Sequence, residues 1–104
     1  MAFATKMKLR KIGDGHDVLC LVKHPMETGL RKDQKTGEVI PAHYIEIMTF
    51  TLNGNTVAEA ILGQGVSKDP LTGIHMVGAK AGDTVAVAWS DNKGESGGAE
   101  TTVQ

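Results

Sequence analysis

Polar and apolar residues alternate at every second position along much of the chain, which is the pattern of a β-strand with one buried face. Residues 6–12 interleave apolar residues with Lys and Arg. In residues 84–90, Val85, Val87 and Trp89 face one way, and small or polar residues face the other. The pattern predicts almost no helix. It predicts strands at residues 6–12, 18–22, 42–52, 56–62, 71–79, 84–90 and 99–103.

Turn-forming segments separate these strands. Asn53-Gly54 is the strongest hairpin signal, and it lies between the strands at 42–52 and 56–62. Turns spaced by roughly 8 to 12 residues are typical of an all-β sandwich. We therefore predict one domain, residues 1–104, folded as an immunoglobulin-like β-sandwich of about seven antiparallel strands. The chain lacks the cysteine pair of true immunoglobulin domains, so the prediction concerns architecture only.

The apolar pattern also assigns faces to two strands. Residues 18–22 are apolar without interruption, as in a strand covered on both faces or lying at an interface. Within residues 42–52, strict alternation places Met48 and Phe50 on one face and Ile45 on the other.

Charge and composition exclude several classes of function. The formal net charge of -1 argues against a general nucleic-acid or membrane-surface binder, because no net positive field would attract phosphate. No apolar run approaches the length needed to cross a membrane. The basic residues near the N-terminus are interpreted as outward side chains that protect an edge strand, rather than as an electrostatic docking strip. They are Lys6, Lys8, Arg10 and Lys11.

The residues before the first strand contain no continuous apolar segment of the kind found in a secretory signal. The single cysteine excludes an intramolecular disulfide but does not identify the compartment.

A copper site is the sharpest chemical alternative. Together, His16, Cys20, His24 and Met26 resemble the ligand set of a blue-copper protein. However, Cys20 lies in the middle of an apolar run, and Pro25 leaves one residue between His24 and Met26. We therefore interpret Cys20 as a buried thiol and predict no metal and no cofactor. A small copper-binding or redox protein that uses Cys20, His24 and Met26 remains the alternative.

No pattern in the sequence indicates an active site, and we predict that the protein is not an enzyme. Cys20 has no histidine committed to it by a motif, and no serine lies in a nucleophile elbow. The four histidines are expected to be scattered over the fold. His43 is expected to anchor a loop by hydrogen bonding, while His75 and Met76 are expected to point to opposite faces.

Residues 24–44 form an unusually long polar connection between two strands. Loops of this length in a small domain are usually functional or disordered. Here Pro25 and Pro41 restrict the backbone near the two ends of the segment, which favours a held shape over a flexible insertion.

The same segment resembles the SoxZ family, the smaller subunit of the SoxYZ carrier of bacterial thiosulfate oxidation. The resemblance begins with His-Pro-Met-Glu-Thr-Gly at residues 24–29 and continues with Arg-Lys-Asp at 31–33 and Ile-Pro at 40–41. Later motifs fall where that family would place them. These are Lys-Asp-Pro at 68–70, Gly-Asp at 82–83 and Trp-Ser-Asp-Asn-Lys-Gly at 89–94.

The resemblance implies a non-catalytic subunit that forms a heterodimer with SoxY and makes transient contacts with other Sox enzymes. It also implies a periplasmic location, reached by co-export with SoxY. In that system a cysteine on the glycine-rich C-terminal arm of SoxY carries the sulfur adduct. The tail of the present chain has glycine but no cysteine.

Two parts of the chain are candidates for docking. The apolar face of residues 18–22 or that of residues 85–89 is expected to supply the interface with SoxY, and also to permit self-association in isolation. The long segment is a hypothetical docking surface, read alternatively as a solvated hairpin tip whose ion pairs contribute little. Its proposed docking residues are His24, Pro25, Met26, Glu27, Thr28, Gly29 and Arg31.

Overall fold

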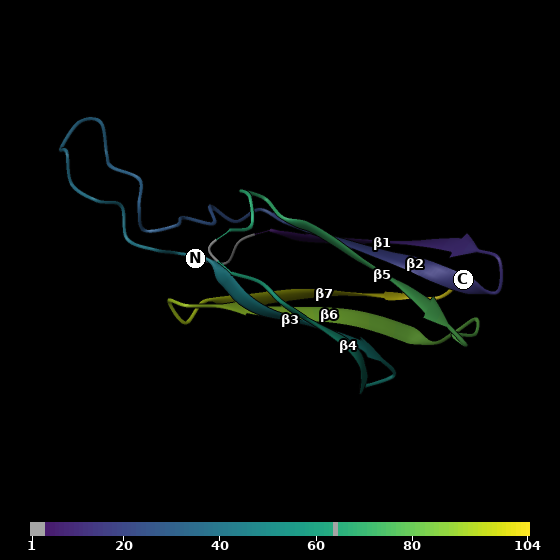
Figure 1. Cartoon of the computed structure of the whole chain (residues 1–104). Helices are drawn as coiled ribbons and strands as arrows, with labels where there is room; N and C mark the ends of the chain where they lie inside the picture. The colour runs from purple at the N-terminus through teal and green to yellow at the C-terminus, as the bar shows by residue number, and fades with distance from the viewer. Residues whose placement is uncertain (1–3, 64) are drawn as a thin grey trace.

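A computed structural model describes residues 4–63 and 65–104 and contains seven strands (Figure 1). All the pairings between them are antiparallel. The strands are β1 (Thr5–Ile12), β2 (Gly15–Val22), β3 (Ile45–Leu52), β4 (Asn55–Ile61), β5 (Leu71–Val77), β6 (Thr84–Asp91) and β7 (Ser96–Thr102).

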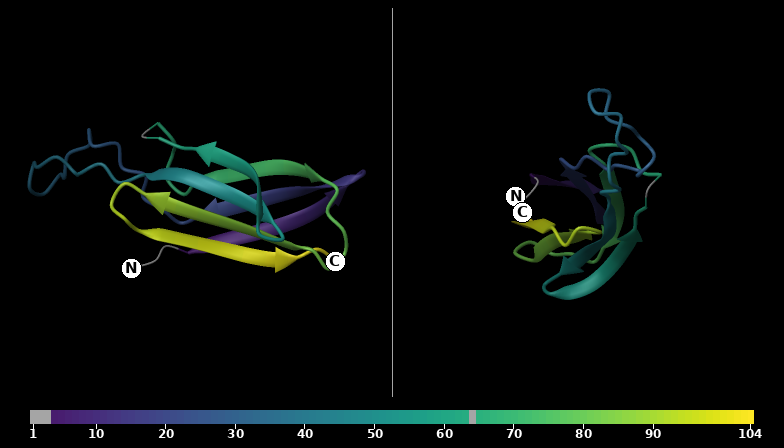
Figure 2. Two further views of the ribbon diagram at one scale, coloured as in Figure 1. Left: turned by 90° about the horizontal axis from the view of Figure 1, so that it is seen from below. Right: turned by 90° about the vertical axis from the view of Figure 1, so that its left-hand side faces the viewer.

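The strands form two sheets that pack face to face (Figures 1 and 2). One sheet has the order β1-β2-β5 and the other β4-β3-β6-β7. This arrangement confirms the predicted all-β sandwich. No helix among the described residues is long and apolar enough to cross a membrane.

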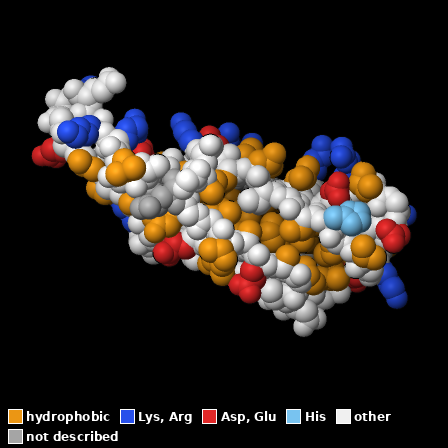
Figure 3. Space-filling model, in the orientation of Figure 1, with side chains coloured by type: hydrophobic (Ala, Val, Ile, Leu, Met, Phe, Trp, Pro, Cys, Tyr) orange, Lys and Arg blue, Asp and Glu red, His pale blue; other side chains and the backbone are white. Residues whose placement is uncertain are grey.

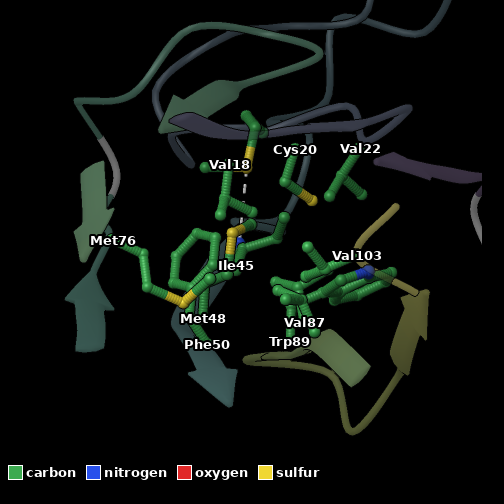
Figure 4. Close-up of a cluster of buried hydrophobic side chains, with 12 residues drawn as sticks. Val18, Cys20, Val22, Ile45, Met48, Phe50, Met76, Val87, Trp89 and Val103 are labelled. Carbon is green, nitrogen blue, oxygen red and sulfur yellow. Dashed lines mark hydrogen bonds between the residues drawn. The ribbon is translucent and has the colours of Figure 1, made fainter. Parts of the chain in front are cut away.

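The core lies between the sheets and is formed mainly by the inward-facing side chains of the central strands (Figure 4). Val18, Cys20 and Val22 of β2 are fully buried and face the second sheet. The inward side chains of residues 18–22 and of residues 85–89 are thus taken up by the core, whereas Leu19 and Leu21 lie on the outer face of β2 and are half-buried. The buried side chains from the second sheet include Met48, Phe50, Val85, Val87 and Trp89.

The predicted face of Ile45 is also wrong. Ile45 is fully buried together with Met48, although strict alternation would place the two side chains on opposite faces. The register between β3 and β6 shifts between Ile45 and Ile47. A bulge of this kind inserts one extra residue into the strand and returns the next inward position to the core.

The two edge strands β1 and β7 close one side of the sandwich (Figure 2). Trp89 fills this side, and its indole Nε1 donates a hydrogen bond to Thr5 Oγ1 at 2.8 Å. Gly97 pairs with Trp89 across the β6–β7 ladder and lies directly against the indole. Lys6 and Lys8 are exposed on β1, as expected for an edge strand with basic outward residues.

Candidate partner-docking arm

The connection from β2 to β3 leaves the body of the sandwich as a projecting hairpin, here called the arm, residues 24–44 (Figure 1). Isolated antiparallel bridges join Glu27 to His43 and Lys32 to Val39. At the inner bridge, the Glu27 amide donates to the His43 carbonyl at 2.7 Å, and the His43 amide donates back at 2.9 Å. The arm is thus held by its own backbone, which confirms the expectation of a held shape.

A single carboxylate connects both ends of the arm to the second sheet. Asp91, at the end of β6, is buried, and its Oδ2 lies 2.9 Å from His24 Nε2 and 2.7 Å from His43 Nε2. His24 opens the arm and His43 precedes its last residue. We call this three-residue cluster the staple.

The ring orientation of His24 follows from its second nitrogen. The Met26 backbone amide donates to His24 Nδ1 at 3.1 Å, so Nδ1 is an acceptor and the ring proton resides on Nε2. His24 Nε2 therefore donates to Asp91 Oδ2. The rings of His24 and His43 also meet edge to face, with centroids 4.6 Å apart, and His24 meets Trp89 in the same way at 5.6 Å.

The other carboxylate oxygen of Asp91 organises the β6–β7 turn. Asp91 Oδ1 accepts hydrogen bonds from the backbone amides of Lys93 at 3.0 Å and Glu95 at 2.9 Å. Burial alone would raise the pKa of Asp91, but the hydrogen bonds from His24, the Glu95 amide, His43 and the Lys93 amide outweigh it. The net effect is a pKa below the ordinary value for Asp, so the carboxylate is held in its ionised form.

The staple brings together three side chains that could in principle hold a metal ion, since their donor atoms lie within 4.8 Å of one another. The tautomer of His24 does not fit this role. A neutral histidine that binds a metal through Nε2 carries its proton on Nδ1, and this proton would face the Met26 amide hydrogen. The cluster is instead a hydrogen-bonded connection between the arm and the sheet.

The structure corrects the expectation that the histidines are scattered, because His24 and His43 share one acceptor. It confirms His43 as a hydrogen-bonding anchor of the loop. It also confirms that His75 is exposed while Met76 is buried. Sequence reasoning missed Asp91, which reads as an ordinary turn residue at the start of Asp-Asn-Lys-Gly.

The predicted docking residues divide into a buried base and an accessible outer part. Met26 is only 5% exposed and belongs to the buried base. Its backbone adopts φ of 49°, and its Sδ accepts the Ile45 amide at 3.3 Å, which turns the side chain towards the core. His24 is fully buried in the staple. The half-buried members of the predicted set are Pro25, Glu27, Thr28 and Gly29.

Arg31 is the exposed member of the set. Its guanidinium holds the Glu27 carboxylate through two hydrogen bonds, of which the one from Nε to Oε1 measures 3.1 Å. The hydrogen bond from Arg31 lowers the pKa of Glu27, and the same contact raises the pKa of Arg31. All of residues 30–39 are exposed, including Leu30, whose side chain is 85% accessible. The arm thus presents a fixed surface to solvent.

A shallow hollow of about 600 Å³ lies at the base of the arm. Its lining is small and largely apolar. Gly29 stands there with φ of 86°, and a Cβ at this position would meet the Ala42 side chain at 3.2 Å. Glycine is therefore required for both the backbone conformation and the close approach. The hollow is lined by Thr28, Gly29, Leu30, Pro41, Ala42 and Gly65.

The proposed copper ligands are used in other ways. Cys20 is fully buried in the core of β2. His24 Nδ1 accepts one backbone amide, and Met26 Sδ accepts another. Both ring nitrogens of His24 and the sulfur of Met26 are therefore occupied by hydrogen bonds, and the geometry does not favour that alternative.

We expect Cys20 to be chemically inert in the folded protein. Burial raises the pKa of its thiol to about 11 from a usual value of 9.0. A rise of this size leaves about 100-fold less thiolate at pH 8, before steric protection is considered. Iodoacetamide labelling followed by mass spectrometry should therefore be at least 100-fold slower for the native protein than for the urea-unfolded protein. Equal rates in the two states would contradict this assignment.

Comparison with known proteins identifies one family. The sequence matches the family described as "Sulphur oxidation protein SoxZ" over residues 5–102, which is nearly the whole chain. No curated protein matches the chain.

Proposed function

The chain belongs to the SoxZ family of sulphur oxidation proteins, and on that premise we propose that it is the non-catalytic subunit of a SoxYZ carrier. In this proposal it binds SoxY, whose C-terminal cysteine carries the sulfur intermediate, and helps present that intermediate to the other Sox enzymes. The proposal includes a periplasmic location reached by co-export with SoxY. The observation that carries the proposal is an arm fixed at its base and exposed along its outer part.

The positions of the buried polar groups favour a structural role for this chain rather than a catalytic one. Among the described residues, the buried polar or charged side chains are His24 and Asp91. Both are committed to the staple, and the Cys20 thiol lies in the core with a raised pKa. These groups hold the fold together and are not placed to attack a substrate.

The outer arm has features of a recognition surface. Glu27 orients the guanidinium of Arg31, and the preceding residue, Leu30, is exposed, so the arm offers both a planar donor group and an apolar side chain. Because the arm is already ordered, a partner would lose little conformational entropy by binding it.

Co-expression with a matching SoxY followed by native mass spectrometry tests the central proposal. A stable one-to-one complex is the expected result. A folded chain that forms no complex with SoxY would reject the proposal.

Reversal of the charge of Arg31 tests the role of the arm. Arg31→Glu places two carboxylates together where an ion pair stood and removes the donor group from the surface. We expect affinity for SoxY or for a visiting Sox enzyme to fall by about tenfold, which is typical of a contributing interface arginine. Titration calorimetry would measure this change.

Lys8→Glu, on β1 and outside the arm, makes the same change in net charge and is the matched control. Unchanged affinity of Arg31→Glu for both SoxY and the Sox enzymes would show that the arm is only a solvated hairpin.

A further inference from the structure

The side of the sandwich opposite β1 and β7 is open. β4 and β5 are the outermost strands of their sheets on this side. Among the described residues, no strand pairs with their outer edges. Figure 3 shows hydrophobic side chains gathered in the hollow between the two sheets. The outer edges therefore present backbone donors and acceptors on both sides of an apolar groove.

The groove exists because the inward-facing residues of β4 are too small to fill the space between β4 and β5. Ala58 and Ala60 are the inward residues of β4, whereas Ile74 and Met76 are the inward residues of β5. The alanines do not reach across to the opposite sheet, and a groove of about 500 Å³ remains. It is lined by Leu52, Val57, Ala58, Ile74, His75, Met76 and Val77.

Exposed apolar residues concentrate on the same two strands. Seven large hydrophobic side chains are exposed among the described residues, and four of them lie on β4 or β5. These four are Val57 (45% exposed), Ile61 (77%), Leu71 (66%) and Val77 (61%). Val57 and Val77 line the groove, and Ile61 and Leu71 lie further along the same two strands. Exposed apolar residues gathered on two edge strands are a usual mark of a protein-binding surface.

Protective charge is missing from this edge. β1, on the closed side, carries Lys6, Lys8, Arg10 and Lys11. β5 carries no Lys, Arg, Asp or Glu, and β4 carries only Glu59. His75 of β5 is already paired, since its Nδ1 lies 2.8 Å from Asp17 Oδ1. Edge strands that avoid pairing normally display charged side chains, and the near absence of charge on β4 and β5 therefore favours their contact with another protein.

We propose that the β4–β5 groove is the binding site for SoxY. In this proposal SoxY inserts an uncharged, extended strand with apolar side chains between the outer edges of β4 and β5. This inference rests on the proposed function and assigns its interface. The unpaired backbone groups favour an extended segment, the lining favours apolar side chains, and the near absence of charge excludes a charged one. A second copy of the chain would offer another hollow edge, and its projecting arm carries the charges of Arg31, Lys32, Asp33 and Lys35, which do not suit an apolar groove.

Substitution of lysine at two exposed rim positions tests the proposal. In Val57→Lys and Val77→Lys, SoxY would have to bury an ammonium group in an apolar interface. Each should weaken binding by about 30-fold or more in titration calorimetry, as expected when an interface must bury an unpaired charge. Thr102→Lys, an exposed position on β7, adds the same charge on the closed side and should change affinity by less than about threefold.

Three further observations complete the test. Both rim positions are well exposed, so the unfolding midpoints of the variants should match that of the unsubstituted chain. Amide hydrogen exchange in β4 and β5 should slow on addition of SoxY. Unchanged affinity in both rim variants, while the unsubstituted chain still binds, would overturn the groove assignment and leave the proposed function standing.

Two other outcomes would also be decisive. A chain that dimerises through this edge, with dimerisation lost in Val57→Lys and SoxY binding retained, would overturn SoxY as the occupant. Failure of the unsubstituted chain to bind SoxY would reject the proposed function itself, together with the inference that rests on it.

Discussion

Replacement of Asp91 by alanine is expected to lower the free energy of unfolding by about 3 kcal/mol or more. The substitution removes the acceptor of His24 Nε2 and His43 Nε2, and also that of the Lys93 and Glu95 amides. His24 is fully buried, so water cannot readily replace the lost oxygen. Urea denaturation followed by tryptophan fluorescence would measure the change.

The pH dependence supplies a second readout for the same residue. The folded-state pKa of Asp91 lies below its ordinary value of about 3.9, so the carboxylate contributes stability that is fully present above that pH. This contribution is lost as the pH falls through the folded-state pKa. The difference in stability between the unsubstituted chain and Asp91→Asn should therefore shrink as the pH is lowered below about 4.

Asp14→Ala is the matched control, because Asp14 is exposed in the β1–β2 turn. It should change stability by less than about 0.5 kcal/mol. A loss below about 1 kcal/mol in Asp91→Ala, or a difference that does not vary with pH, would show that the staple contributes little to the fold.

The second large effect is expected from Gly97→Ala, which adds one methyl group. A Cβ at Gly97 would lie 2.8 Å from Cζ2 of the Trp89 indole and 2.9 Å from its Nε1. The indole is rigid, buried, and hydrogen-bonded to Thr5, so it cannot move aside without loosening the contact between β6 and β1. Overpacking of this kind costs about 2 to 3 kcal/mol.

Thermal unfolding by circular dichroism would detect this loss, and near-ultraviolet spectra would report displacement of Trp89. Gly63→Ala is the matched control, because no atom lies within 4 Å of a Cβ at that position. If Gly97→Ala unfolds at the same temperature as Gly63→Ala, the close packing of Gly97 on Trp89 is not needed for stability.

Periodicity was sufficient to predict the strands of the sandwich, because each strand has one buried and one accessible face. It failed at Ile45, where a bulge changes the local period without any proline or glycine to mark it. It also began the last strand three residues too late. Gly97 and Gly98, which lie outside the predicted strand at residues 99–103, pair with Trp89 and Ala88 in β7.

The staple could not be predicted, since it depends on contacts between distant residues. Asp91 is 67 positions from His24 and 48 from His43, and no local pattern relates them. A histidine within two residues of a proline at each end of a long loop was the available signal, but it does not identify the acceptor. The groove was missed for a similar reason, because two alanines in a strand show a lack of volume only when the opposite sheet is known.

Because of the staple, the outer part of the arm should tolerate replacement by other sequences. Because Asp91 fastens both ends of the arm to the body and the inner bridge joins those ends to each other, we expect that its outer residues can change in length and sequence without disturbing the sheets. Added length in such a loop costs only a small closure entropy. The distal arm is thus a natural grafting point, at which foreign recognition segments could be displayed on a scaffold that folds independently of them.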